Sequence, residues 1–145
     1  MGCKVTMSLL NERQDGEIGD DWRYSVHARV FNDGIKGEGT IAVAKHSLPS
    51  GVTQETPDSV ESAVMEAGDC GSSIMVRIEV DAAEVDFLFH DEGYSSTDVE
   101  MACPGEGSAA ISEDVEVSVG VTESGGVGGD SAVLKLGIRL VAECD

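Results

Sequence analysis

Basic and aromatic residues are both scarce in this sequence. Nine lysines and arginines stand against 28 aspartates and glutamates, so the formal net charge is −19. A diffuse negative field of that size repels nucleic acid phosphates and anionic lipid headgroups, so we expect no nucleic acid and no membrane partner. Aromatic residues make up 4% of the chain, so a core must be built mainly from aliphatic side chains.

The sequence also lacks long apolar runs and paired cysteine motifs. No stretch approaches the roughly 20 apolar residues of a membrane-spanning helix, and the N-terminal region has no apolar segment typical of a signal peptide. The four cysteines, which are Cys3, Cys70, Cys103 and Cys144, form no CxxC pair. A zinc ribbon or a thioredoxin-like motif is therefore excluded. We expect a protein made in the cytoplasm with mostly reduced thiols, although the sequence leaves open whether any cysteines are bonded.

Alternating apolar and polar residues recur throughout the chain, and this period of two is the main signal of β-strands. About eight such segments are present, near residues 3–9, 22–30, 40–48, 74–80, 85–89, 99–103, 115–121 and 134–142. Turn residues separate many of them, at 32–34, 91–93, 104–105 and 124–129. Strands with one wet face belong to antiparallel sheets. We therefore predict one all-β domain over residues 1–145, an antiparallel β-sandwich or jelly-roll-like fold, with Phe87, Val117 and Leu136 in its core.

One segment has helical rather than strand-like spacing. Thr56 can cap a helix and Pro57 suits a first helical position. Apolar residues then follow at 60, 63, 64 and 67, which is the spacing of one helix face, and Gly68 can end it. The pattern predicts a short helix over about residues 57–67.

The opening residues MGCKVT have two interpretations. They match the N-myristoylation pattern, with Gly2 as acceptor, Thr6 in place and Cys3 available for a second lipid. They also begin the alternation that continues to Leu9. The chain has no basic patch to assist a lipid anchor, so the pattern favours a strand.

The stretch from Gly68 to Ser72 resembles the nucleophile loop of chymotrypsin-like proteases, particularly their cysteine variants. That resemblance implies Cys70 as nucleophile and His27 or His46 as base. Those proteases need two β-barrels and a histidine far upstream of the nucleophile, and too few residues separate His27 from this loop to form a first barrel. We therefore expect a plain loop here and no enzymatic activity.

Calcium is the most defensible ligand, because Ca²⁺ takes carboxylate and carbonyl oxygens from loops. The candidate ligands lie in predicted turns and are Asp20, Asp21, Asp33, Asp91 and Glu92. The segment from Asp91 to Ser96 resembles the clamp stretch of βγ-crystallin calcium sites, two acids followed by Ser-Ser. That resemblance implies a Ca²⁺ cofactor held by Asp91 and Glu92. The alternative is a set of solvated acidic turns.

The acidity has three explanations: adaptation to molar salt, divalent-cation sites, or solubility with a basic partner. Acids run from Glu12 to Asp145 rather than clustering in a tail, which favours salt adaptation. The sequence therefore predicts a non-catalytic structural or assembly protein. It would act through protein contacts, as a homo-oligomer or within a larger complex such as a virion, for example as a capsid decoration or tail component. A Ca²⁺-binding β-sandwich module is the alternative.

Overall fold

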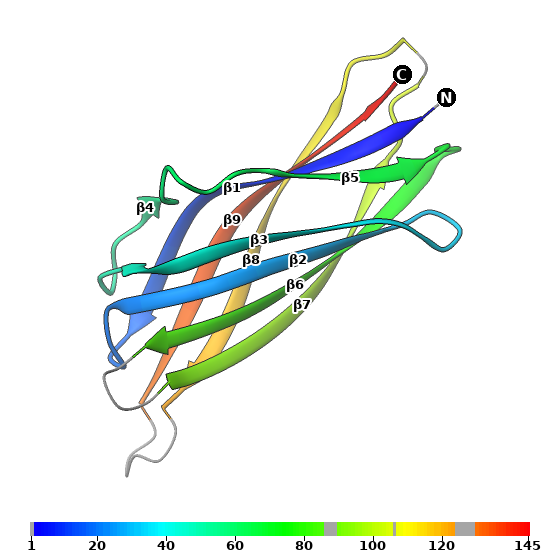
Figure 1. The fold of residues 1–145 in the computed structure, drawn as a ribbon. Helices are drawn as coiled ribbons and strands as arrows, with labels where there is room; N and C mark the ends of the chain where they lie inside the picture. Colours follow the sequence, from blue (N-terminus) through cyan, green and yellow to red (C-terminus); the bar gives the residue numbers. More distant parts are fainter. Residues whose placement is uncertain (1, 86–89, 106, 124–129) are drawn as a thin grey trace.

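The computed structural model describes residues 2–85, 90–105, 107–123 and 130–145. These residues form nine β-strands and no helix. The strands are β1 (Cys3–Gly16), β2 (Asp21–Phe31), β3 (Ile35–Ser47), β4 (Gln54–Glu55), β5 (Ala63–Gly68), β6 (Ser73–Val85), β7 (His90–Ala102), β8 (Ile111–Thr122) and β9 (Ser131–Cys144). They make two antiparallel sheets that pack together (Figure 1), which confirms the predicted all-β sandwich.

The four-stranded sheet has the order β3-β2-β6-β7. The five-stranded sheet has the order β4-β1-β9-β8, and β5 pairs with another part of β1. The first and last long strands, β1 and β9, are neighbours, so the two ends of the described chain lie side by side (Figure 1). The interpretation of MGCKVT as the start of a strand is confirmed, because Cys3, Val5 and Met7 alternate into the core.

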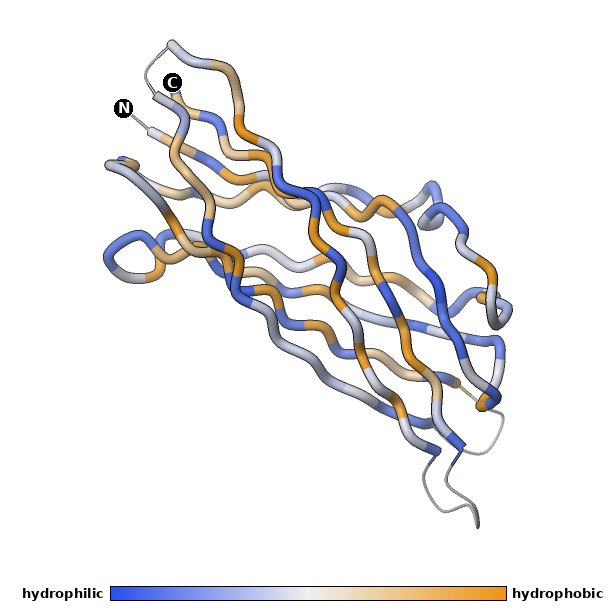
Figure 2. The backbone as a smooth tube through the Cα atoms, turned by 180° about the vertical axis from the view of Figure 1, so that it is seen from behind, coloured by the Kyte–Doolittle hydropathy of each residue, from blue (hydrophilic) through white to orange (hydrophobic). Residues whose placement is uncertain are grey.

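The core lies between the two sheets, because each long strand turns its apolar residues inward at every second position. Figure 2 shows this as alternating hydrophobic and hydrophilic colour along the strands. Val117 and Leu136 are fully buried, as predicted, and Phe87 lies outside the described residues. The largest buried apolar side chains are Trp22, Met7, Leu48, Met65, Ile78, Met101, Leu134, Leu136, Ile138 and Leu140.

The helix predicted over residues 57–67 is wrong. The part of the chain from Pro57 to Val60 forms a turn, with Val60 N donating to Pro57 O at 3.0 Å, and β5 follows. Within β5 the burial alternates as in a strand: Met65 is 1% exposed and Val64 is 60% exposed. Strand β5 pairs with the edge of β1, and this backbone pairing outweighs the weak helical preference of the segment.

The strand pattern near residue 90 also differs from the prediction. Asp91, Glu92 and Gly93 were expected to form a turn, but they pair with β6 inside strand β7. The inward positions of β7 include Gly93, Ser95 and Thr97, which carry no apolar signal. The expected strand at residues 85–89 and the hairpin tip at 124–129 fall mostly or wholly outside the described residues.

A register shift in β1 between Leu9 and Asn11 changes which residues point inward. Beyond the shift, Glu12 and Gln14 are fully buried. Both hold the connection between β3 and β5 against β1: Gln14 Nε2 donates to Leu48 O at 3.0 Å, and Gln54 Nε2 donates to Glu12 Oε2 at 2.8 Å.

Glycines allow the two sheets to close at both sides. A Cβ atom at Gly93 on β7 would collide with the backbone oxygen of Gly120 on β8. On the other side, a Cβ at Gly37 on β3 would collide with backbone atoms of Glu66 on β5. These close approaches cover strand edges that would otherwise be open to pairing with other chains.

All four cysteines are joined in disulfides, so the expectation of mostly reduced thiols is wrong. Cys3 and Cys144 are register partners on β1 and β9. Cys70, between β5 and β6, bonds to Cys103 just beyond β7. Disulfides of this kind persist mainly in oxidising surroundings.

Candidate contact surface on the four-stranded sheet

The solvent-facing side of the four-stranded sheet, called here the outer face, carries side chains in rows. Because β3, β2, β6 and β7 are paired in register, outward residues lie beside one another across the strands. The rows that follow from the pairing are Arg23, Ala83 and Glu92; then Ala42, Ser25, Asp81 and Tyr94; then Thr40, His27, Glu79 and Ser96; then Glu38, Arg29, Arg77 and Asp98; and last Phe31, Met75 and Glu100.

The middle of the outer face is held by ion pairs within the chain. Arg29 contacts Glu38 and Glu79, each at 3.0 Å. Arg77 donates to Asp98 with both its Nε, at 2.8 Å, and its Nη2, at 3.2 Å. These hydrogen bonds from Arg77 hold the pKa of Asp98 below its usual value.

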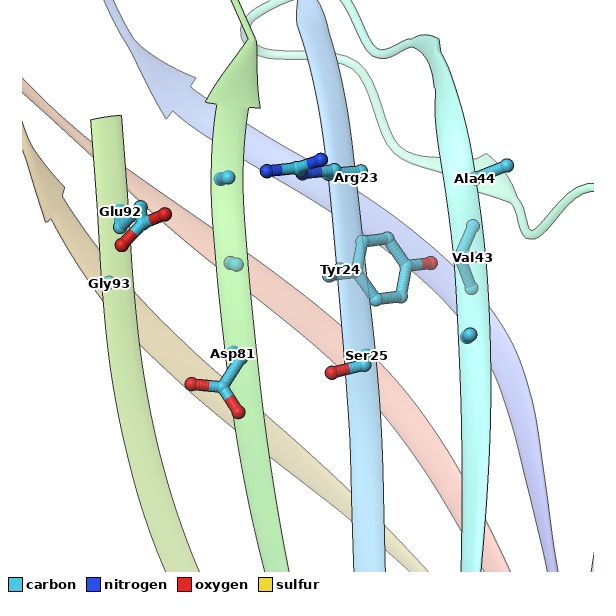
Figure 3. A pocket seen from close by; sticks show the side chains of 11 residues that line it. Arg23, Tyr24, Ser25, Val43, Ala44, Asp81, Glu92 and Gly93 are labelled. Atoms are coloured by element: carbon cyan, nitrogen blue, oxygen red, sulfur yellow. The ribbon is translucent and has the colours of Figure 1, made fainter. Parts of the chain in front are cut away.

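A groove of about 440 Å³ lies over the first two rows (Figure 3), and we call it the Arg23 groove. Three charged side chains, Arg23, Asp81 and Glu92, extend from β2, β6 and β7 on its solvent side. The remaining outward lining is small and consists of Ser25, Ala42, Ala44 and Ala83. Small residues at these positions make the depression, because the flanking side chains are long.

The three charges of the Arg23 groove differ from Arg29 and Arg77 of the outer face in their ion pairing among the described residues. Arg23, Asp81 and Glu92 are exposed, and none has an ion pair with any residue that the structure describes. The other four arginines do have one. Their pairs are Arg13–Asp15, Arg29–Glu38, Arg77–Asp98 and Arg139–Asp114. Arg23 is thus the one arginine with no carboxylate partner within the described part of the chain, although the sequence contains 28 acids.

A buried polar cluster supports the sheet behind the groove. Tyr24 donates its hydroxyl to Glu12 Oε1 at 2.6 Å, and His46 Nε2 lies 2.6 Å from Glu12 Oε2. Burial and the bond to Glu12 raise the pKa of Tyr24 well above its usual value. Tyr24 therefore stays a neutral donor, and Glu12 links β1 of one sheet to β2 and β3 of the other.

The predicted calcium ligands separate into two groups. Asp20, Asp21, Asp91 and Glu92 lie at one end of the four-stranded sheet, while Asp33 lies in the β2–β3 turn at the opposite end. At the first end the side chains face different ways, because Asp91 is 1% exposed and points inward, whereas Glu92 points outward.

No three histidine, cysteine or acidic side chains of the described ranges come together in a way that could hold a metal ion. Asp33 instead borders a second depression of about 450 Å³, beside Phe31 and Met75 at the far end of the outer face. In the loop compared with proteases, Cys70 is bonded to Cys103, and His46 is engaged with Glu12.

Sequence reasoning missed the Arg23 groove and the buried Glu12. The groove depends on which residues lie opposite each other across four strands, and alternation within one strand does not reveal this. A signal for Glu12 was present, since apolar alternation stops at Leu9 although the pairing partner β9 continues its own alternation.

The fold defines the chain as an acidic, antiparallel all-β sandwich with two disulfides. No family model matches the chain, and no curated protein matches its sequence. The described residues include no helix with the length and apolar character needed to cross a membrane.

Proposed function

We propose that this chain is a non-catalytic structural protein that acts through protein–protein contacts in a larger assembly. The observation that carries the proposal is the outer face. There the 57%-exposed Tyr94 lies beside Asp81 in one row, and Arg23 and Glu92 belong to the next row. None of these three charges has an ion pair among the described residues. Tyrosine and arginine are residue types enriched in protein interfaces. The covered strand edges also favour faces over edges as contact surfaces.

The acidity fits a high-salt setting for that assembly. Two surfaces that each carry many carboxylates repel one another in dilute buffer. At about 1 M salt the screening length falls to about 3 Å, and this long-range repulsion is largely removed. Acids spread over strands and loops on both sheets keep such a surface hydrated without concentrating charge at one place.

A virion component, such as a capsid decoration or tail protein, is the form of assembly that we propose. Single β-sandwiches are common in such roles, which is an argument by analogy of fold. The disulfides add support, since virion surfaces belong to the oxidising surroundings in which such bonds persist.

Light scattering after size exclusion tests the proposal across a potassium chloride series from millimolar to molar. We expect the mass to rise above that of the 15.1 kDa monomer as salt increases. A monomer at every salt and protein concentration would contradict the assembly function and the high-salt setting together.

Calcium binding is the second candidate: Asp20, Asp21 and Glu92 lie at the same end of the four-stranded sheet, although no three acidic side chains of the described residues come together as a metal site. Thermal melting with calcium chloride and then with a chelator tests it. Calcium that binds only the folded state raises the free energy of unfolding by RT ln(1 + [L]/Kd), where [L] is the free calcium concentration. The melting temperature should therefore rise when calcium is added and fall again with the chelator. Unchanged melting, with magnesium as the matched control, would refute it.

A further inference from the structure

The two strands on either side of β6 carry opposite charge on the outer face. The outward charged and polar residues of β2 are Asp21, Arg23, Ser25, His27 and Arg29, and those of β7 are His90, Glu92, Tyr94, Ser96, Asp98 and Glu100. The β2 set holds two arginines and one acid, Asp21, whereas the β7 set holds three acids and neither lysine nor arginine. The outward residues of β2 are therefore net positive and those of β7 net negative, so these two strands complement each other in charge across β6.

A two-fold axis along β6 would use this complementarity. Such an axis keeps the strand direction and places β2 of one copy over β7 of the other, within the same rows. It also places β6 over β6, so that Asp81, Glu79 and Arg77 each face their own copy, and the favourable charge contacts are confined to β2 and β7. In an interface of this symmetry each contact between two different residues is made twice. Arg23 of each copy then faces Glu92 of the other copy, and Arg29 faces Asp98.

The shapes on the two strands also match under this symmetry. In the second row, the exposed Tyr94 of one copy comes over Ser25 of the other, which belongs to the small-residue floor of the Arg23 groove. Ala42 lies beside Ser25 on β3. The large aromatic side chain of Tyr94 would therefore lie over a depression of about 440 Å³ whose outward lining residues are small.

We infer that the Arg23 groove is the contact site for a second copy of this chain, in a two-fold dimer that joins the outer faces. The inference rests on the proposed assembly function and names its partner. Arg23 and Glu92 supply the first-row contacts because neither has an ion pair among the described residues of its own chain, whereas Arg29 and Asp98 are already paired.

Association should strengthen with salt, which is unusual for a contact that includes ion pairs. Each copy carries a formal charge of −19, and this repulsion acts over long distances that salt screens efficiently. The ion pairs at Arg23 act at contact distance between partly desolvated groups, where salt screens them less. The net effect is a dimer favoured at molar salt.

The test uses two charge-reversal variants of the full chain, Arg23→Glu and Glu92→Arg. In a homodimer of either variant, residues 23 and 92 carry the same charge and face each other at two places. Its dimer dissociation constant in molar potassium chloride should rise by more than about tenfold. When the two variants are mixed, every reversed residue faces an opposite charge, so heterodimers should form. Sedimentation equilibrium gives the constants, and a fluorescent label on one variant reports the heterodimer.

Matched controls separate contact from net charge and from misfolding. Arg139→Glu makes the same charge change on the other sheet, where Arg139 pairs with Asp114, and should leave the dissociation constant unchanged. Tyr94→Ala removes the aromatic side chain and should also weaken the dimer. All the changed residues are solvent-exposed, so each variant should fold, and circular dichroism checks this.

Two outcomes would contradict the proposed interface, and they differ in whether the proposed function also fails. If the wild type associates but the Arg23 and Glu92 variants match Arg139→Glu, or their mixture forms no heterodimer, this interface is wrong and the assembly function stands. If the wild type is a monomer at all salt concentrations, the interface and the proposed function both fail.

Discussion

Substituting alanine for Gly93 should destabilise the fold, because β7 approaches β8 closely at that position. The added Cβ would overlap the backbone oxygen of Gly120 and press on Cγ2 of Val121 at 2.7 Å. A backbone oxygen cannot rotate away as a flexible side chain can. The substitution would therefore force β7 and β8 apart.

The size of the effect follows from two opposing terms. Overpacking a closely packed contact costs about 1–3 kcal/mol, while replacing glycine by alanine at a tolerant position stabilises by about 0.4–1 kcal/mol through the unfolded state. The clash at Gly93 involves backbone, so we place its cost at the upper end, and the net loss should be about 2 kcal/mol. For a chain of this length, the melting temperature should fall by about 5–8 °C.

Urea unfolding of Gly93→Ala and Gly120→Ala measures this difference. Gly120 lies on the other side of the same contact, but its Cβ would point to open space with nothing within 4 Å. Gly120→Ala should therefore match or slightly exceed wild-type stability. Equal stabilities for the two variants would refute the argument that β7 and β8 close the sandwich through Gly93.

Three further predictions concern the core and the charges. Val117→Asp should prevent folding, because it puts a charge at a fully buried position; soluble protein with wild-type circular dichroism would contradict the strand register. Glu12→Ala should cost about 3 kcal/mol in urea unfolding, since it leaves buried polar partners unsatisfied, and Glu12→Gln should cost less. The Arg77–Asp98 pair stabilises the fold fully when the pH is above 3.8, the ordinary pKa of an aspartate, and this stabilisation is lost as the pH falls through the lowered pKa of Asp98. The melting-temperature difference between wild type and Asp98→Asn should therefore vanish in strong acid, and a constant difference would contradict this.

The strands were predictable from sequence where an apolar face continues without interruption, as in β6, β8 and β9. The helix error at residues 57–67 arose because β5 has too few residues for its alternation to outweigh a helical spacing. The pairing edge of β1, which decides the outcome, is distant in sequence. The inward Glu12 was not predicted, because a register shift reverses the face of every later residue in β1, and the end of the apolar alternation at Leu9 was the one signal of it.

The candidate site was less accessible to sequence reasoning than the fold. Asp91 and Glu92 were predicted from sequence as calcium ligands on one loop, but both lie within strand β7. Within a strand, neighbouring residues face opposite sides, so one is buried and the other borders the Arg23 groove. The relation of Arg23 to Glu92 requires the order β2-β6-β7, and alternation patterns contain no information on strand order.

The bond between Cys3 and Cys144 turns the polypeptide between them into a covalent ring, and the bond between Cys70 and Cys103 divides that ring into two smaller ones. A protease that nicks one exposed loop therefore releases no fragment. The nicked molecule keeps its mass, apart from one added water, until a reductant opens the rings. A particle built from such subunits would tolerate isolated cleavage without shedding pieces of its surface.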